Sequence, residues 1–332
     1  MLQYLIILLD DTATSYCHYE NECHDDKLIS IEDLKKGIFY GMKENLMIQF
    51  VYPDYELPQE YKAIINTIDH NDIVSSLCED EKLRQNADVI IYHDWTGLQF
   101  SSFDQEGVYT LRTSKKDLFD RYKLLKGIIT SSRRLNIVIT DIETFTDTDF
   151  NIYKDVLAYL GVILKNCYAE GKSPQLNLLT DRMMLDNMNN CNAGTENITL
   201  APDGNFYVCP AFYLSGKCDG NEQYLNEVCQ KGYSIGSLED GLDIKNPQLY
   251  KHDHAPICRK CDAYQCRRCV WINRKTTLEV NTPSREQCII AHLERNASRK
   301  LLTSIRELGV FLPGKEIKEI NYLDPFDVKD KF

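Results

Sequence analysis

The chain has 332 residues, a length that suits about two domains at ~150 residues per domain. Its 43% hydrophobic and 27% charged residues are the balance of a folded protein. The net charge of −12 argues against nucleic acid as a ligand, because an acidic surface repels phosphate backbones. The first apolar run, Leu5–Leu9, is too short to span a bilayer and meets two aspartates at once, so we expect a buried strand, no export signal and no membrane partner.

The N-terminal half alternates strand-like runs with helical patterns. Strands are expected at 4–9, 46–52, 89–92, 108–111, 136–140 and 176–179, and helices at 30–43, 59–68, 117–131 and 149–167. Six strands that alternate with helices predict a parallel sheet. The count suits a partial (β/α)6 barrel, and an open doubly wound sheet is the alternative that the pattern leaves open.

After about residue 185 the helical periodicity stops and turn residues such as Pro202–Asn205 become frequent. A last helix is expected to begin near Pro283 with Thr282 as its cap. Beyond Gly314 the chain is a charged and peripheral tail. We therefore expect a barrel at 1–185, a cysteine-rich domain with a C-terminal helix at 186–315, and a tail at 316–332.

Thirteen cysteines are an unusual number, and seven of them lie between Cys209 and Cys269. Without an export signal we expect the cytoplasm, where disulfides are rare, so clustered thiols indicate metal ligation. The central run reads Cys258-x2-Cys261-x4-Cys266-x2-Cys269, and each C-x-x-C loop lets two thiolates converge on one metal. A zinc knuckle and iron–sulfur clusters, which also take four thiolates each, both stay open at this point.

The wider order of cysteines resembles the seven-cysteine SPASM domain that follows radical SAM peptide-modifying enzymes. Cys191-x12-Gly204-x4-Cys209 precedes the central run and Cys288 follows it, although the third and fourth spacings are each one residue shorter than the family's. The resemblance implies two [4Fe–4S] clusters. It assigns the first cluster to Cys258, Cys261, Cys266 and Cys288. It gives the second cluster Cys191, Cys209 and Cys269, with Cys167, Cys218, Cys229 or an open corner as the fourth position.

The N-terminal end resembles a radical SAM enzyme with a degenerate motif. Such enzymes hold their catalytic cluster with C-x3-C-x2-C after the first barrel strand. Here Cys17 fits the third position, whereas Asp10 and Thr14 stand at the first two. The family's Gly-Gly-Glu-Pro, which contacts SAM after the second strand, is also missing, and the chain reads Phe50-Val-Tyr-Pro53 there. Loss of both motifs implies that the site no longer binds SAM.

The whole chain is similar to the group called CXXX repeat peptide maturases. The segments that carry this likeness are Leu8–Thr12, Ser15–Tyr19, Gln49–Gln59 and Thr282–Cys288. These proteins come from peptide-maturation gene clusters whose precursor peptides carry cysteine at every fourth residue. The resemblance implies that this chain modifies or handles a ribosomally made peptide.

Other side chains near the predicted strand ends also suit chemistry. Asp10 and Asp11 end the first strand, and Asp141 and Glu143 follow the fifth, where a barrel places its functional residues. They are candidate acid–base or peptide-binding groups, with simple strand-end turns as the alternative. Cys17 is a further candidate, because a second thiol and two histidines nearby could complete a zinc site instead of a solvated loop. These three neighbours are His18, Cys23 and His24.

The sequence leaves three alternative functions open. The first is a peptide-maturation protein with a radical-SAM-like barrel, a SPASM-like metal-binding domain and a cysteine-rich precursor peptide as partner, helped by a partner maturation enzyme. The second is an active enzyme that uses the auxiliary clusters, or a metal at Cys17 and Cys23, without cleaving SAM. The third is a non-enzymatic zinc-binding adaptor or chaperone of a peptide-modifying complex.

Overall fold

The chain folds into two compact units. The computed structural model describes residues 2–13, 16–17, 27–99, 102–184, 191–215, 233–261, 263, 266 and 269–309. The first unit combines the chain up to His93 with Asn192–Tyr250, and the second combines Asp94–Cys191 with the chain from Lys251 onward. Each unit draws on two separate stretches of sequence, and the domain boundaries expected at 185 and 315 remain predictions.

The first unit is built on a mostly parallel sheet. Its strands are β1 (Tyr4–Leu8), β2 (Met47–Val51), β3 (Asn71–Ser75), β4 (Val89–Tyr92), β8 (Asn197–Leu200) and β9 (Phe206–Tyr207). They lie in the order β4-β3-β2-β1-β8-β9, with β8 and β9 antiparallel as a hairpin. The sequence did not predict β3, because its first two residues, Asn71 and Asp72, are polar. Two short strands, β10 (Gly236–Ser237) and β11 (Gly241–Leu242), form a separate hairpin.

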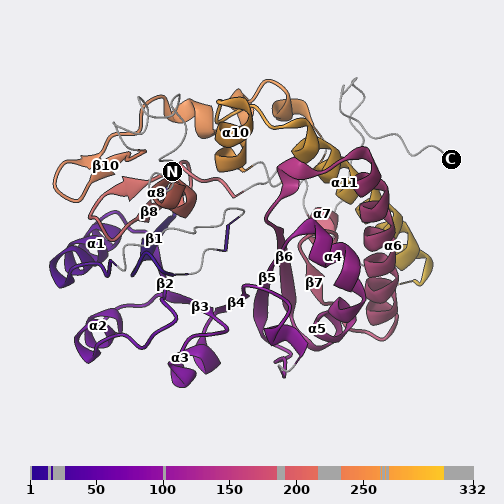
Figure 1. Cartoon of the computed structure of the whole chain (residues 1–332), viewed down its shortest axis with the longest axis horizontal. Helices are drawn as coiled ribbons and strands as arrows, with labels where there is room; N and C mark the ends of the chain where they lie inside the picture. The colour runs from indigo at the N-terminus through magenta and orange to yellow at the C-terminus, as the bar shows by residue number, and fades with distance from the viewer. Residues whose placement is uncertain are drawn as a thin grey trace. The chain divides into compact units, whose positions relative to one another are not determined.

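Helices cover this sheet (Figure 1). They are α1 (Ile31–Lys43), α2 (Gln59–Ile65), α3 (Glu81–Asn86) and α8 (Pro210–Ser215). The side chain of Ser30 caps α1 by accepting a hydrogen bond from the backbone N–H of Asp33. Gly37 lets α1 approach the sheet, since a Cβ there would clash with the side chain of Leu200.

The second unit carries three further parallel strands and the longest helices. The strands are β5 (Val108–Thr113), β6 (Arg134–Ile139) and β7 (Gln175–Leu176), in the order β7-β6-β5. The helices are α4 (Lys115–Arg121), α5 (Leu125–Ser131), α6 (Asp147–Ala169), α7 (Thr180–Met184), α10 (Val270–Thr277) and α11 (Arg285–Glu307). The two longest, α6 and α11, pack side by side (Figure 1).

Two details of the second unit differ from the sequence prediction. The single helix expected at 117–131 is two helices, α4 and α5, separated by a 3₁₀ turn at Tyr122–Leu124. Helix α11 is capped by Ser284 rather than Thr282, because the Ser284 side chain accepts the hydrogen bond from Gln287 N–H. Pro283 therefore stands just outside the helix instead of at its first position.

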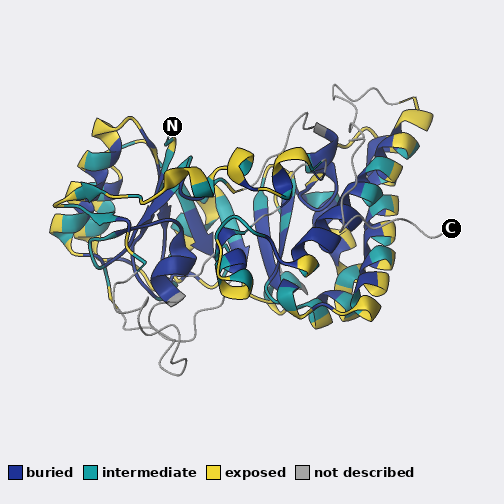
Figure 2. Ribbon diagram, turned by 90° about the horizontal axis from the view of Figure 1, so that it is seen from above, coloured by how far each residue is buried: buried dark blue, intermediate teal, exposed yellow. Residues whose placement is uncertain are grey.

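Buried residues follow the strands, and exposed residues follow the outer faces of the helices (Figure 2). Strand β1 shows the pattern clearly, because every residue from Leu5 to Leu9 is buried, as a parallel strand covered on both faces requires. The predicted mixed α/β class with a mostly parallel sheet is confirmed. In the described part of the chain, no helix combines the length and apolar character needed to cross a membrane.

Candidate functional site

The carboxyl end of β1 places Asp10 and Asp11 in the interior of the first unit. Asp10 is 1% exposed and Asp11 is fully buried. Asp10 accepts hydrogen bonds from the Thr12 backbone N–H (2.8 Å), the Thr12 hydroxyl (2.6 Å) and the Tyr55 hydroxyl (2.7 Å). Burial, and then the bond to Asp10, raise the pKa of Tyr55, so its hydroxyl remains a donor. Asp11 accepts from the backbone N–H of Lys27 at 2.9 Å. Protein donors thus already hold both carboxylates.

The same edge of the sheet carries a polar group that sequence reasoning missed. Ser75 ends β3, His93 follows β4 and Asp54 follows β2, so parallel strands bring them together. The Ser75 hydroxyl lies 3.1 Å from His93 Nε2, and the same nitrogen lies 3.8 Å from Asp54 Oδ2. A serine–histidine–aspartate triad needs the carboxylate on the other ring nitrogen, so this geometry is not that of a hydrolase.

In the second unit, Asp141 and Glu143 follow β6 as predicted, but the carboxylate of each already has a partner within the protein. Asp141 accepts from the backbone N–H of Lys115 at 2.8 Å, and burial raises the pKa of its carboxyl. Glu143 pairs with the ammonium of Lys275 at 2.8 Å. A half-buried carboxyl with a raised pKa suits proton transfer, so Asp141 remains the better acid–base candidate of the two.

Four of the predicted cysteine ligands gather in the second unit. We call Cys258, Cys261, Cys266 and Cys288 the four-cysteine group. Cys266 is almost fully buried, and this burial raises its pKa well above the ordinary thiol value. The nearby thiols of Cys258, Cys288 and Cys261 raise it further, whereas the guanidinium of Arg182 lowers it. Cysteines that are up to 30 positions apart in the sequence therefore affect the pKa of the same thiol.

The surroundings of this group combine small apolar residues with donors to sulfur. Cys266 packs with Ala263 and Ala291 in an apolar cluster, and Cys261 packs against the cluster. The backbone N–H of Ala263 donates to Cys261 Sγ at 3.4 Å. His292 Nε2 also lies 3.4 Å from that sulfur. Backbone N–H groups directed at sulfur are typical of thiolates that ligate a metal or cluster.

A buried ion pair joins α7 to α11. Arg182 on α7 donates to Glu294 on α11 at 2.5 Å, and their side chains are 1% and 5% exposed. The Tyr153 hydroxyl, from α6, donates to the other Glu294 oxygen at 2.7 Å. These charges gave no sequence signal, since Arg182 stands outside every motif and Glu294 lies within a helix that reads as amphipathic.

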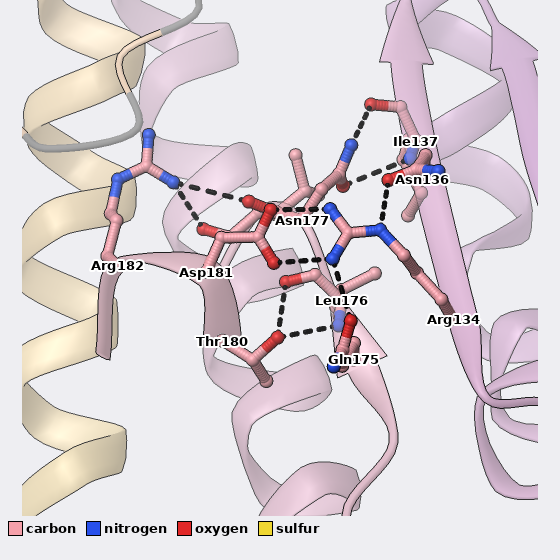
Figure 3. Close-up of polar contacts among 10 residues, drawn as sticks. Arg134, Asn136, Ile137, Gln175, Leu176, Asn177, Thr180, Asp181 and Arg182 are labelled. Atoms are coloured by element: carbon pink, nitrogen blue, oxygen red, sulfur yellow. Dashed lines mark hydrogen bonds and ion pairs between the residues drawn. The ribbon is translucent and has the colours of Figure 1, made fainter. Parts of the chain in front are cut away.

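A polar network fixes the helix that carries Arg182 (Figure 3). Arg134 forms a two-pronged ion pair with Asp181, at 3.0 and 2.6 Å. The Asn177 side chain pairs with the backbone of Ile137 on β6 through bonds of 3.0 and 3.2 Å. Arg182 itself donates to the Leu178 carbonyl at 2.9 Å. Strand β6 therefore sets the position of α7, and α7 presents Arg182 toward α11.

The other predicted ligands have varied environments. Cys17 is half-buried, Cys191 is exposed and Cys209 is buried. Cys269 stands at the N-terminal cap position of α10 without a side-chain capping bond, and its backbone N–H donates to Gln287 Oε1 at 3.2 Å. Thr14, His18, Cys23, His24, Cys218, Cys229 and the tail at 316–332 lie outside the described residues. Cys78 and Cys167, by contrast, are buried thiols within the two units.

Within the described residues, no group of three or more His, Cys, Asp or Glu side chains is arranged to hold a metal ion. The four-cysteine group nevertheless has the donor chemistry of a thiolate centre, because it holds four neighbouring thiols, an N–H donor to sulfur and a nearby guanidinium. A [4Fe–4S] cluster binds each thiolate to a different iron, so its ligands stand farther apart than those of one tetrahedral ion. The chemistry of this donor set fits such a cluster.

The fold, a mixed α/β arrangement with a mostly parallel sheet, is similar to that of several solved structures. A solved structure described as a histidine-tagged form of anSMEcpe with bound AdoMet has a TM-score of 0.56 and 11% identity, over 92% of this chain and 100% of that one. Native anSMEcpe with bound AdoMet gives 0.54 and 12%, over the same shares. Native anSMEcpe with bound AdoMet and Cp18Cys peptide gives 0.52 and 11%, again over 92% and 100%. No family model and no curated protein matches the sequence.

Proposed function

We propose that this chain is a peptide-maturation protein that binds a cysteine-rich precursor peptide and no longer cleaves SAM. Its four-cysteine group holds a [4Fe–4S] cluster, and Cys191, Cys209 and Cys269 contribute to a second one. The protein works in the cytoplasm, with a partner maturation enzyme supplying chemistry that the degenerate barrel lacks. The precursor carries cysteine at every fourth residue, as in the CXXX repeat peptides.

One observation carries the cluster assignment. Four cysteines assigned to one cluster by sequence order, Cys258, Cys261, Cys266 and Cys288, are electrostatic neighbours in the structure. Four neighbouring buried thiols cannot easily all ionise, because each thiolate charge raises the pKa of the other thiols. A metal cluster removes this penalty by taking all four as thiolates, and it supplies electron transfer when bound.

The surroundings of Asp10 support the loss of SAM cleavage. Asp10 stands where a radical SAM enzyme has the first cysteine of its catalytic motif, and a carboxylate cannot replace that thiolate in a three-cysteine site. Here the carboxylate is satisfied by Thr12 and Tyr55. This end of β1 is consequently filled by a stable hydrogen-bonded arrangement of the protein's own groups.

A peptide partner is supported by the fold and by the spacing of the precursor's cysteines. Structures with this fold include one described as holding a Cp18Cys peptide together with AdoMet. In a helical peptide, side chains four residues apart share one face, and in an extended peptide they share one side. Either conformation presents a one-sided row of thiols to a binding groove.

Titration of peptides against the full-length protein tests this function. We expect a leader–core peptide with cysteine at every fourth position to bind about tenfold more tightly than its all-serine counterpart, a difference of about 1.4 kcal/mol. A matched control carries the same number of cysteines at every fifth position, a spacing that places them on one side in neither a helix nor an extended chain. Equal affinity for the cysteine and serine peptides would overturn the proposal that the thiols are recognised.

A further inference from the structure

A groove runs along the second unit between its two longest helices, α6 and α11, which pack side by side (Figure 1). It encloses about 340 Å³. Asp147 pairs with Arg285 at 3.1 Å, and further along both helices the Tyr153 hydroxyl donates to Glu294 at 2.7 Å. The two helices therefore run in the same direction, and we call the space between them the α6–α11 groove.

The length of the groove suits one peptide helix. Its lining residues extend from Lys154 to Lys165 on α6 and from Leu293 to Ser304 on α11, eleven positions in each case. At a rise of 1.5 Å per residue this is about 16 Å, or roughly three helical turns. A single small anion cannot reach both ends of such a groove. A complex of two globular proteins needs more, because it usually buries over ~1,000 Å².

The surface of the groove is apolar and contains a glycine that packing within the chain does not explain. Leu157, Leu293 and Leu301 line it, and Val162, another lining residue, is 58% exposed. Gly161 also lines the groove, in the interior of α6, where glycine is less favourable than alanine. A Cβ at this position would lie in open space, away from the other described residues. The missing side chain therefore leaves room in the groove itself.

The charged residues along the groove are all of one sign. Lys154, Lys165 and Lys300 line it, and the lining residues include no aspartate or glutamate in the described part of the chain. The whole chain has 50 acidic residues and 38 basic ones, so three lysines in an acidic protein form a local positive site. Among the described residues, no acidic side chain pairs with Lys154 or Lys165. An apolar groove with these lysines is complementary to a helix that has an apolar face and acidic flanks.

We propose that the α6–α11 groove binds the leader of the precursor peptide as an acidic amphipathic helix of about three turns. This inference rests on the proposed function, because the leader belongs to the peptide that the protein is proposed to bind. Apolar leader residues at i, i+3, i+4 and i+7 contact the leucines of the groove, as in other helix-in-groove complexes. Acidic residues on the flanks face the lysines, which a neutral row of cysteine thiols cannot satisfy, so the leader and not the cysteine core occupies this groove.

Fluorescence anisotropy with the full-length protein tests the proposal. The probe is a labelled, cysteine-free peptide of about four helical turns, with leucine at i, i+3, i+4 and i+7 and glutamate on the flanks. One matched peptide has lysine in place of glutamate, and another has the residues of the probe in scrambled order. We expect the acidic probe to bind at least tenfold more tightly than either, with an affinity that falls as salt is added. The unlabelled leader–core peptide should displace it.

Variants of the protein assign the binding to the groove. Lys154→Glu and Lys165→Glu should each weaken binding of the acidic probe about tenfold. Gly161→Leu, which fills the groove, should weaken it as much without lowering the melting temperature, because leucine favours a helix more than glycine and enters open space. The matched controls are Gly127→Leu, at an exposed glycine of α5 that also faces open space, and its neighbour Lys126→Glu. Both should bind the probe as the wild type does, and the lysine variants report on the groove even if Gly161→Leu does not fold.

The outcomes are distinguishable. Weaker binding in the groove variants, with unchanged controls and displacement by the leader–core peptide, establishes the proposal. Equal affinity for the acidic, basic and scrambled peptides, unchanged binding in the groove variants, or a probe that the leader–core peptide does not displace overturns this inference alone. Self-association that Lys154→Glu abolishes also overturns it, because a second copy of the chain then occupies the groove. The comparison of cysteine and serine core peptides tests the proposed function separately, since the probe contains no cysteine.

Discussion

Cys266 shows how the surroundings of a single residue can support a proposed ligand. A buried thiol that stays protonated behaves as a small apolar side chain, as Cys78 and Cys167 do. Cys266 differs because it packs in a cluster with Ala263 and Ala291, against which Cys261 also packs, and other thiols raise its pKa beyond the effect of burial. The resemblance to SPASM domains implied a group of Cys266 with Cys258, Cys261 and Cys288, whereas the spacing of the C-x-x-C pairs alone left open a zinc knuckle with Cys269 in place of Cys288. The buried pair of Arg182 with Glu294 could not be predicted, because it depends on α7 and α11 packing together.

His70 provides a pH-dependent prediction at the residue scale. Its Nε2 lies 3.3 Å from Asp72 Oδ1, and the hydrogen bond to Asp72 raises the pKa of His70 above the ordinary value of 6.5. A pKa raised in the folded state adds stability below pH 6.5 that is lost as the pH rises through the folded value. His70→Gln should therefore lower the melting temperature at pH 6 more than at pH 9.

Thermal unfolding of both proteins at the two pH values measures this effect. The matched comparison is His254→Gln, which replaces an exposed histidine of the same chain. An equal loss for His70→Gln at pH 6 and pH 9 would show that the Asp72 contact does not stabilise the charged ring.

Helix α11 is the element that connects the fold to the candidate metal centre. It carries Cys288 in its first turns, Glu294 in its middle, and an apolar face that packs on α6. The sequence predicted this helix and its apolar stripe, because the stripe has a 3.6-residue period. The sequence-based prediction placed the N-terminal cap at Thr282, two residues too early. Thr282, Pro283 and Ser284 all suit a helix start, and only the folded backbone selects one of them.

The cap of α11 gives a prediction at the scale of this element. The Ser284 hydroxyl accepts a hydrogen bond from Gln287 N–H, and Cys288 is the next residue. Ser284→Ala should cost about 1 kcal/mol of stability and loosen the turn that holds Cys288. Reconstituted protein should then lose its iron faster to a chelator.

Thr303→Ala, near the other end of the same helix, is the control. Its hydroxyl donates within the helix to the Arg299 carbonyl at 3.1 Å, and it lies fifteen residues along α11 from Cys288. We expect its iron release to match the wild type. If Ser284→Ala released its iron as slowly as the wild type, this result would show that the cap does not support the cysteine site.

At the scale of the whole molecule, fold and motifs give different information. The alternation of strands and helices predicted the mixed α/β class, and the structure confirms it. At 11% identity, the solved structures with this fold share little sequence with the chain. The Ser75–His93 contact was not predictable, because it joins the ends of β3 and β4, and β3 itself carries too little apolar pattern to be recognised.

The absence of SAM cleavage is the prediction that concerns the chain as a whole. With Asp10 hydrogen-bonded at the end of β1 and Cys17 as the one matching position of the motif, we expect no deoxyadenosine from SAM under reducing, anaerobic conditions. Chromatography of the reaction products against a protein-free blank measures this. Deoxyadenosine above the blank, lost on Cys17→Ala, would show that the barrel retains radical chemistry.

The central claim is that the four-cysteine group binds an iron–sulfur cluster, and metal analysis tests it most directly. Anaerobically reconstituted wild-type protein should hold iron and acid-labile sulfide in equal amounts, about four of each per cubane cluster. Cys266→Ala should lose about four of each, whereas Cys78→Ala, which removes a buried thiol elsewhere, should lose none. Zinc without sulfide in the wild type, or full iron content in Cys266→Ala, would contradict the account.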